Sequence, residues 1–382
     1  MVEYTRRRMV ETTASALAVG SFAGCLSDAS FASDRDADEP TAQASFFVFG
    51  DFASQVAGDV ATAETLVPVG QHGHGWEPGP QIQGDVLDAD LFVRGVDGFQ
   101  PWADDMAGNV REDGGDTALV DVGSNVDLLV AGSRGDGNHD GGGHESHDEG
   151  GGHDEAGHDG TTDHGGHDET HHGDGGDHEG TAHEGHDEES SHDGEDGHDH
   201  AGGTDPHFWL DPLRAKRAVE TVREGFASVD GANADAYAEN ADAYASRLDD
   251  LHASFESALD GASKDVILVA GHDAFGYFAD RYGFEVATLT GVSPDGAPTP
   301  KDVETAQQVI ADHDLDHVLA DPLASQRAAD QLVAETDAGS VLPLTSIPGR
   351  TDEWADRGWG YVDVMTEINL PTLERALGAP EQ

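Results

Sequence analysis

The sequence has one cysteine and three lysines among its 382 residues. A single thiol excludes disulfide bonds within the chain and any zinc site built from several cysteines. Lysine and arginine together number 19 against 77 aspartates and glutamates, so the formal net charge is −58. Such a charge argues against nucleic acid or an anionic membrane surface as a partner. The composition resembles that of proteins from extreme halophiles, which stay hydrated in concentrated salt.

The only marked apolar run near the N-terminus, at 13–23, is too short to cross a bilayer. It follows three arginines at 6–8 and is followed by Gly24 and Cys25. This arrangement resembles a twin-arginine export signal that ends in a lipobox, at which the signal is removed and a lipid is attached to the cysteine. The alternative is a buried structural cysteine. We therefore expect a lipoprotein signal at 1–25, with lipid on Cys25, and a flexible tether at 26–43.

A stretch without lysine or arginine lies between His139 and His200. It holds fifteen of the 22 histidines and 21 of the acidic residues, interleaved with glycine. So little apolar surface cannot offset the entropy of folding, and we predict that 138–203 is a disordered loop. Neutral imidazole is a good ligand for borderline divalent cations, which indicates a loop that holds zinc-like metals weakly at many places. The alternative is a merely solvated acidic linker.

Short apolar runs alternate with helix-compatible stretches on both sides of this loop. The runs that we predict to be strands are Ser45–Phe49, Thr65–Val69, Leu91–Val93 and Ala118–Val122 before it, and Asp265–Ala270, Val286–Leu289, His317–Ala320 and Ser340–Leu344 after it. This alternation predicts an α/β protein with two similar lobes, each a parallel sheet flanked by helices. About 290 residues remain once the leader and the loop are set aside, which is enough for two domains. We place the lobes at 44–137 and 262–382.

Residues 204–261 complete the first lobe and include a segment without strand signals. Its large apolar residues recur at steps of three, four and seven, and they are Tyr237, Tyr244, Leu248, Leu251 and Phe255. This spacing predicts a long helix with one apolar stripe. Its position between two predicted sheets favours a linker helix that joins the lobes over an ordinary surface helix of the second lobe.

Three histidines outside the loop stand at positions typical of metal ligands. His74 lies in a loop rich in glycine and proline after an apolar strand, and His272 follows another strand directly. Loops that follow the strands of an open α/β sheet are where ligands bind. His207 precedes Phe-Trp-Leu, which can wall a pocket, and Asp205 is near enough in sequence to orient its ring. Each of the three, taken alone, is also explained by capping or packing. Ordinary roles are expected for His72, His252, His313 and His317.

Taken together, the motifs resemble those of the cluster A-I solute-binding proteins, zinc- or manganese-binding lipoproteins that supply metal to ABC importers. The resemblance runs from about Ser45 to Leu377. A family loop of the form Gly-x-x-Pro-His-x-(Tyr/Phe)-Glu-Pro is similar to 70–78, with Gly73 in place of the proline. The patterns Asp-Pro-His-x-Trp and His-Asp-Ala-Phe-Gly-Tyr are matched at 205–209 and 272–277.

The resemblance implies one cation held by three imidazoles, those of His74, His207 and His272. Residues that surround and orient such ligands would then be Glu77, Asp205 and Asp273. The resemblance is weakest at the fourth ligand, because manganese-type relatives have an aspartate where this chain has Thr345.

Asp321, at a position where relatives often have glutamate, is our expected fourth metal ligand. The alternatives are a structural turn role for Asp321, with Glu77 or a water as the ligand. Three imidazoles and one open position favour Zn²⁺ over Mn²⁺, which prefers more oxygen ligands.

The function that this resemblance implies is that of a receptor and not of an enzyme. A monomer, lipid-anchored on the outer face of the cell membrane, would capture Zn²⁺ between its lobes and deliver it to an ABC permease and its ATPase. A manganese- or iron-specific member of the same family is an alternative. Another is a histidine-rich metal buffer or chaperone, in which the loop is the active element. A metallohydrolase is a third, supported only by His72-Gly73-His74 near Glu77.

Overall fold

The structure is a computed structural model that describes residues 39–73, 75–113, 115–131, 203–292 and 297–380. The predicted signal with Cys25, residues 26–38 of the predicted tether, residues 138–202 of the predicted histidine-rich loop, and His74 lie outside these ranges. Within them, no helix is both long and apolar enough to cross a bilayer.

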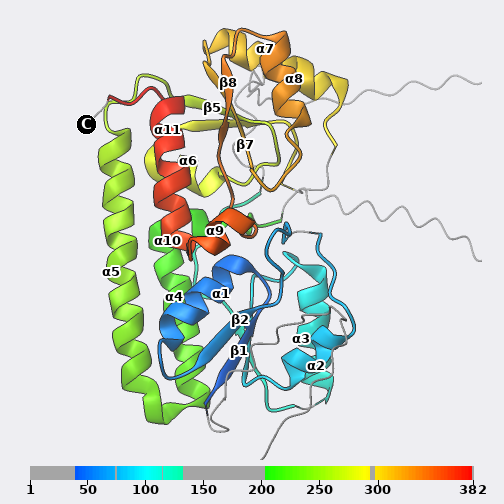
Figure 1. Cartoon of the computed structure of the whole chain (residues 1–382), viewed down its shortest axis with the longest axis vertical. Coiled ribbons are helices and arrows are strands. Elements are labelled where there is room, and N and C mark those ends of the chain that lie inside the picture. Colours follow the sequence, from blue (N-terminus) through cyan, green and yellow to red (C-terminus); the bar gives the residue numbers. More distant parts are fainter. Residues whose placement is uncertain (1–38, 74, 114, 132–202, 293–296, 381–382) are drawn as a thin grey trace, which may run out of the picture. The chain divides into compact units, whose positions relative to one another are not determined.

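Two four-stranded sheets carry the two lobes (Figure 1). In the first the order is β2-β1-β3-β4, and the strands are β1 (Thr41–Ala44), β2 (Thr62–Thr65), β3 (Leu91–Arg94) and β4 (Ala118–Asp121). In the second the order is β6-β5-β7-β8, and the strands are β5 (Val266–Val269), β6 (Glu285–Thr288), β7 (His317–Ala320) and β8 (Ser340–Pro343). All neighbouring strands are parallel. The prediction of two similar α/β lobes is therefore confirmed.

The predicted strand at Ser45–Phe49 is wrong, because this run begins helix α1 (Phe47–Ala57). The strand is the segment immediately before it, β1, which takes in 41–43 from the end of the stretch expected to be a tether. Val48, Phe49 and Phe52 are fully buried. A helix start that is buried on every side has no polar face, so an apolar run there has the same appearance as a buried strand. The run at Thr65–Val69 likewise meets β2 only at Thr65 and continues as a loop.

The remaining helices complete the two lobes. Those of the first lobe are α2 (Gln81–Leu87), α3 (Pro101–Asp113) and α4 (Pro212–Val229), and α5 (Ala234–Leu259) follows. Those of the second lobe are α6 (Gly276–Tyr282), α7 (Pro300–Asp312), α8 (Arg327–Glu335), α9 (Asp352–Asp356), α10 (Tyr361–Val364) and α11 (Leu370–Ala376). Asp211 caps α4, whose first residue is proline, and Thr299 with Asp302 forms a capping box on α7. Both are sequence features that start a helix.

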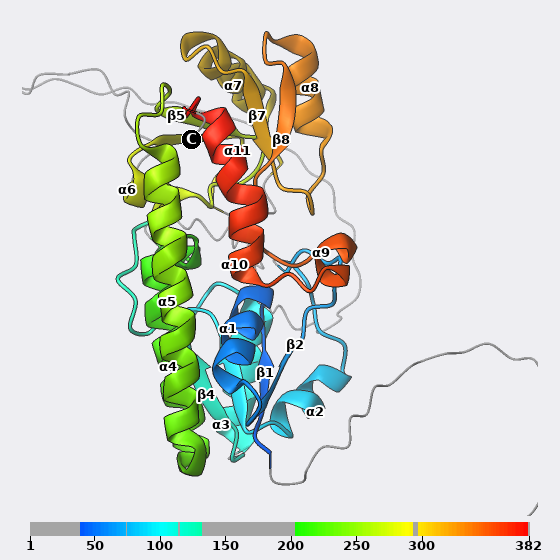
Figure 2. The same ribbon diagram turned by 60° about the vertical axis from the view of Figure 1, so that its left-hand side comes forward.

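Helix α5 is the predicted linker helix, 26 residues long. Its buried residues alternate at steps of four and three, and they are Tyr237, Ala241, Tyr244, Leu248, Leu251, Phe255 and Ala258. With this stripe α5 packs against α1 and α4 of the first lobe and against α6, α10 and α11 of the second. Figure 2 shows α5 running beside α4, to which a short turn joins it.

The largest hydrophobic core belongs to both lobes at once. It contains Phe46 and Phe49 of the first lobe, Trp209, and Leu344 and Tyr361 of the second. Each sheet has in addition a smaller apolar cluster of its own. A wide separation of the lobes would expose the shared core to water, which is costly. The fold therefore favours local movements of loops over a large hinge motion.

Replacing Leu248 by alanine removes buried methyl groups from the middle of the α5 stripe. We expect the free energy of unfolding to fall by about 2–5 kcal/mol, because the site cannot collapse fully around the cavity. Urea titration measures the change. The exposed Glu239 on the same helix provides the control, since Glu239→Ala should stay within about 0.5 kcal/mol of the parent. Equal losses in the two variants would contradict the role given to the stripe.

Candidate metal site

The carboxyl ends of parallel strands bring together the side chains of interest. His272 lies in the loop after β5, Asp321 follows β7 directly, and Thr345 follows β8. His72 lies in the loop after β2. The carboxyl ends of parallel strands are the usual ligand-binding edge of an α/β sheet, and here both lobes contribute.

The centre of the site is a pair of imidazoles, His207 and His272. Their Nε2 atoms are 3.3 Å apart and their ring centroids are 5.2 Å apart. Two imidazole nitrogens bound to one tetrahedral zinc ion at the usual bond length are about 3.3 Å apart. The pair therefore already has the separation that one shared cation requires.

Asp205 determines which nitrogen of His207 faces its partner. Its Oδ1 atom accepts a hydrogen bond from the backbone N–H of His207 at 2.9 Å and lies 2.8 Å from the ring Nδ1. A carboxylate cannot donate, so Nδ1 carries the proton and Nε2 has its lone pair free for a metal. His207 is fully buried and Asp205 is 5% exposed, so water does not compete for the hydrogen bond between them. This tautomer is assigned from the hydrogen-bond network.

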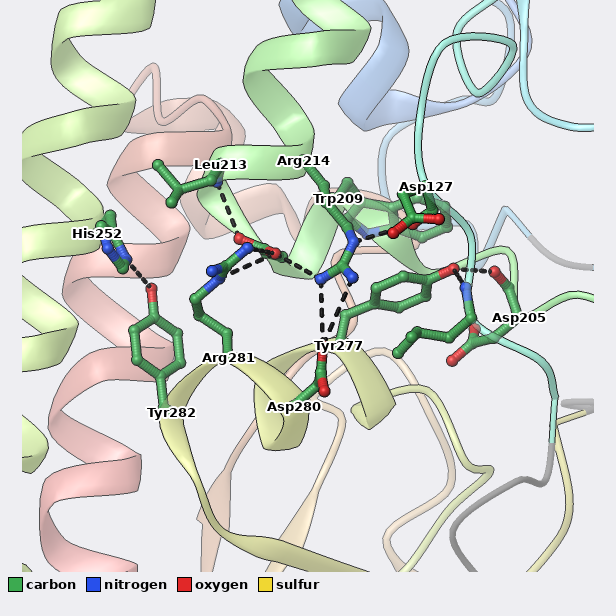
Figure 3. Close-up of polar contacts among 12 residues, drawn as sticks. Asp127, Asp205, Trp209, Leu213, Arg214, His252, Tyr277, Asp280, Arg281 and Tyr282 are labelled. Carbon is green, nitrogen blue, oxygen red and sulfur yellow. Dashed lines mark hydrogen bonds and ion pairs between the residues drawn. The ribbon is translucent and has the colours of Figure 1, made fainter.

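Tyr277 of α6 holds Asp205 in place. Its hydroxyl donates to the Asp205 carbonyl oxygen at 2.6 Å and accepts from the Leu129 backbone N–H at 2.9 Å (Figure 3). The Arg214 guanidinium lies over the Tyr277 ring, 5.0 Å from its centroid. A side chain of the second lobe thus fixes the segment that carries His207.

Asp211 forms a second tie between the lobes close to the first. Its fully buried carboxylate caps α4 through the Leu213 N–H at 2.9 Å. It also accepts from Arg214 at 2.7 Å and from Arg281 of α6 at 2.6 Å (Figure 3). A buried carboxylate with two guanidinium partners is well compensated, whereas removal of one partner would leave charge buried.

Aromatic rings wall the other side of His207. The ring of Trp209 lies 5.3 Å and that of Phe99 6.4 Å from the imidazole. Trp209 donates from Nε1 to the Ser346 carbonyl at 2.8 Å, and its own carbonyl accepts from the Tyr361 hydroxyl at 2.5 Å. This wall keeps water from the imidazole and fixes its neighbours in both lobes.

Burial is the main cause of a strongly lowered pKa of His272, which falls from 6.5 to about 2. The neighbouring His207 and His72 lower this pKa further, because two positive rings at such a distance repel each other. His272 is therefore neutral at any ordinary pH. Neutral imidazole is the form that binds metal.

The sequence predicts an ordinary role for His72, and the structure places its ring near the imidazole pair. Its ring lies 6.3 Å from that of His272, edge-on to it, and its charge acts on both His272 and Asp321. Its neighbour Gly73 stands where the related pattern has proline, and a Cβ there would be 2.5 Å from the Pro348 carbonyl oxygen. The sequence around His72 does not indicate this arrangement, because its neighbours come from loops 200 or more residues away.

Asp321 is half-buried and is bonded within its own lobe. Its Oδ1 atom accepts from the Leu323 N–H at 2.8 Å, and its Oδ2 atom accepts from the Thr345 hydroxyl at 2.7 Å and from the Ser346 N–H at 3.3 Å. Burial raises the pKa of Asp321 above its ordinary value, while these hydrogen bonds and His72 act in the opposite direction. The Thr345 hydroxyl is thus bonded to the Asp321 carboxylate.

The remaining residues considered in the sequence analysis lie outside the imidazole pair, at the surface or in contact with other groups. Glu77 is exposed, and Asp273 is half-buried with its backbone N–H donating to Gly291 at 3.0 Å. His317 lies 3.0 Å from the Ser340 hydroxyl, and His252 lies 3.2 Å from that of Tyr282, as ordinary structural histidines. Among the described residues, no three His, Cys, Asp or Glu side chains already stand together as a complete metal site.

Comparison with known proteins gives a consistent result. The family model described as zinc-uptake complex component A, periplasmic, matches residues 43–376. The high-affinity zinc uptake system protein ZnuA of Bacillus subtilis is 25% identical over 344 residues, which cover 90% of this chain and 89% of the relative. The zinc-binding lipoprotein AdcA of Streptococcus pneumoniae is 25% identical over 330 residues, which cover 86% of this chain and 54% of the relative. The chain therefore spans about half the length of AdcA.

A solved structure has the same fold. The zinc-bound ZnuA-like domain of Streptococcus pneumoniae AdcA superposes with a TM-score of 0.62 at 21% identity, over 89% of this chain and 99% of that chain. At this identity the likeness concerns the architecture of the two lobes.

The lowered pKa of His272 predicts a pH dependence of stability in metal-free protein. The unfolded chain takes up a proton on this residue as the pH falls through about 6.5, whereas the folded chain does not until about pH 2. Acid therefore favours unfolding below about pH 6.5. The free energy of unfolding of the parent should fall between about pH 6.5 and 5, and in His272→Asn this fall should be smaller by up to roughly 2 kcal/mol. Urea titrations of chelator-treated protein at both pH values measure it. The exposed His313→Asn is the control, and equal pH dependence in all three proteins would refute the prediction.

Proposed function

The chain belongs to the family of zinc-uptake complex component A, periplasmic, and on this premise we propose that it captures Zn²⁺ between its lobes and delivers it to an ABC permease. The observation that carries the proposal is the His207–His272 pair, 3.3 Å apart and backed by Asp205. The cation is cargo, so it must bind reversibly. His74 of the same loop as His72 is the third imidazole of this proposal.

The choice of Zn²⁺ rests on the donor set. Nitrogen donors and a threonine at position 345 suit zinc better than manganese, which favours oxygen ligands. A manganese- or iron-specific protein remains the alternative within the same family. The protein is a solute-binding protein and not an enzyme, as its family is one of uptake components.

The proposed place of action is the outer face of the cell membrane, with a lipid on Cys25 as anchor. A curated relative, AdcA of Streptococcus pneumoniae, is itself named a lipoprotein. The permease and its ATPase would be the partners of a monomer. Zinc binding and permease binding are coupled if the permease binds the zinc-loaded form better than the metal-free form. A cation held by both lobes would stabilise the arrangement that the permease recognises.

The histidine-rich loop would serve as a collector that raises the metal concentration near the site. The described residues on its two sides lie together near His207, because Ala131 donates to Gly203 at 2.8 Å and Asp205 donates to Leu129 at 2.8 Å. Val130 and Thr204 form an antiparallel bridge between them. The loop is therefore attached to the described chain within a few residues of His207.

His207→Ala should abolish tight zinc binding, because it removes one nitrogen donor and leaves Asp205 without its partner. Calorimetric titration of zinc in high salt measures the tight phase, expected at one ion per chain. His313→Ala, at an exposed position, should retain it. Retention of the tight phase in His207→Ala would refute the assignment of the site.

Deletion of residues 139–200 should leave the tight phase unchanged and remove most of the weak zinc binding. The reason is that the loop contributes many separate imidazoles and none of the pair. The same titration applies to the shortened chain. Loss of the tight phase on deletion would instead favour the metal buffer, in which the loop is the binding element.

A further inference from the structure

The loop that carries His72 is held on both sides of this residue. The N–H of Gly73 donates to the Pro348 carbonyl at 2.9 Å, and the N–H of Gly70 donates to the Arg350 carbonyl at 2.8 Å. Both acceptors belong to the loop that follows β8 in the second lobe. The backbone of His72 is thereby fixed relative to the lobe that contributes His272.

Close packing reinforces this position. A Cβ at Gly73 would be 2.6 Å from the Phe46 ring, and one at Gly349 would be 2.3 Å from the Gln71 carbonyl oxygen. Gln100, 3% exposed, donates from Nε2 to the Gly73 carbonyl at 3.3 Å and to that of Ser45 at 3.0 Å. The two glycines allow the loops to approach this closely. His72 is thus presented by a rigid frame, with its half-buried ring as the movable part.

The ring of His72 is close to the imidazole pair and to a carboxylate. Its centroid is 6.3 Å from that of His272, compared with 5.2 Å within the pair. Two imidazoles on one tetrahedral zinc have centroids about 5 Å apart. A rotation of the His72 side chain that moves its ring by about 1 Å toward His272 would give this separation. Asp321 accepts from the N–H of Ser346, two residues before the Pro348 whose carbonyl accepts from Gly73, and the charges of Asp321 and His72 interact.

We infer that His72 is a ligand of the zinc ion and that Asp321 is a positioning residue that holds the His72 ring. This rests on the proposed function and deepens it. In this inference Asp321 has toward His72 the role that Asp205 has toward His207, since a carboxylate behind a ligating imidazole fixes its tautomer and orientation. The Asp321 oxygens already accept from Leu323, Thr345 and Ser346. The carboxylate is therefore itself rigid, and it acts on the metal through the ring.

The first test is zinc affinity of the full chain, measured by competition with a chromophoric chelator. His72→Ala should weaken binding of the first equivalent by more than about tenfold, the lower limit for residues that only orient a ligand. The control is His313→Ala, which should match the parent. Thermal unfolding of the metal-free variants checks that both are folded.

The second test uses a double-mutant cycle with Asp321→Asn, which keeps an oxygen acceptor for Leu323. Alone it should weaken zinc binding by about 10- to 100-fold, and in the His72→Ala background it should have little further effect. Full additivity would show that Asp321 acts on the metal without His72 and would overturn its assigned role.

The third test is direct. In ¹⁵N-imidazole NMR spectra the resonance that disappears in His72→Ala should be among those that shift with the first equivalent of zinc. An unshifted His72 resonance, together with parent-like affinity of His72→Ala, overturns the inference. If His207→Ala abolishes tight binding in the same assay, the proposed function stands while this inference fails. If His207→Ala binds normally, the proposed function itself fails.

Discussion

The site depends on one interaction, the hydrogen bond between the buried Asp205 carboxylate and Nδ1 of His207. It fixes the tautomer, directs the Nε2 lone pair toward His272 and makes the imidazole a better electron donor. Without it a fully buried His207 would have two nitrogen atoms of undetermined role. The other contacts around the site serve this pair. Tyr277 donates a hydrogen bond to the Asp205 carbonyl, and the Trp209 ring packs against the His207 imidazole.

The same contacts limit how the protein can move. Tyr277 and Arg281 of α6 bind the segment that carries His207 and Asp211, so the second lobe is tied to the first a few residues from the imidazoles. The hydrophobic core continues through both lobes, and α5 packs against helices of each. A cation can therefore be enclosed by adjustments of the loops after β2 and β8. Recognition by a permease would then depend on the shape of these loops and less on a change in lobe angle.

Much of the fold could be predicted, because parallel strands buried on both faces are short apolar runs and α5 has a regular stripe. The start of α1 could not, since burial on all sides removes the periodicity that distinguishes helix from strand. At the site, local motifs indicated His207 and His272, whose signals lie within a few adjacent residues. The position of His72 near the pair could not be predicted, because its surroundings are formed by Pro348, Asp321 and His272, all distant in sequence. The separation of two imidazoles is likewise a property of tertiary structure alone.

Anomalous X-ray diffraction from zinc-loaded crystals, recorded on both sides of the zinc absorption edge, tests the central claim most directly. The account predicts one dominant zinc peak within about 2.0–2.1 Å of the Nε2 atoms of both His207 and His272. A dominant zinc peak bound elsewhere, with these two imidazoles still in contact with each other, would contradict it.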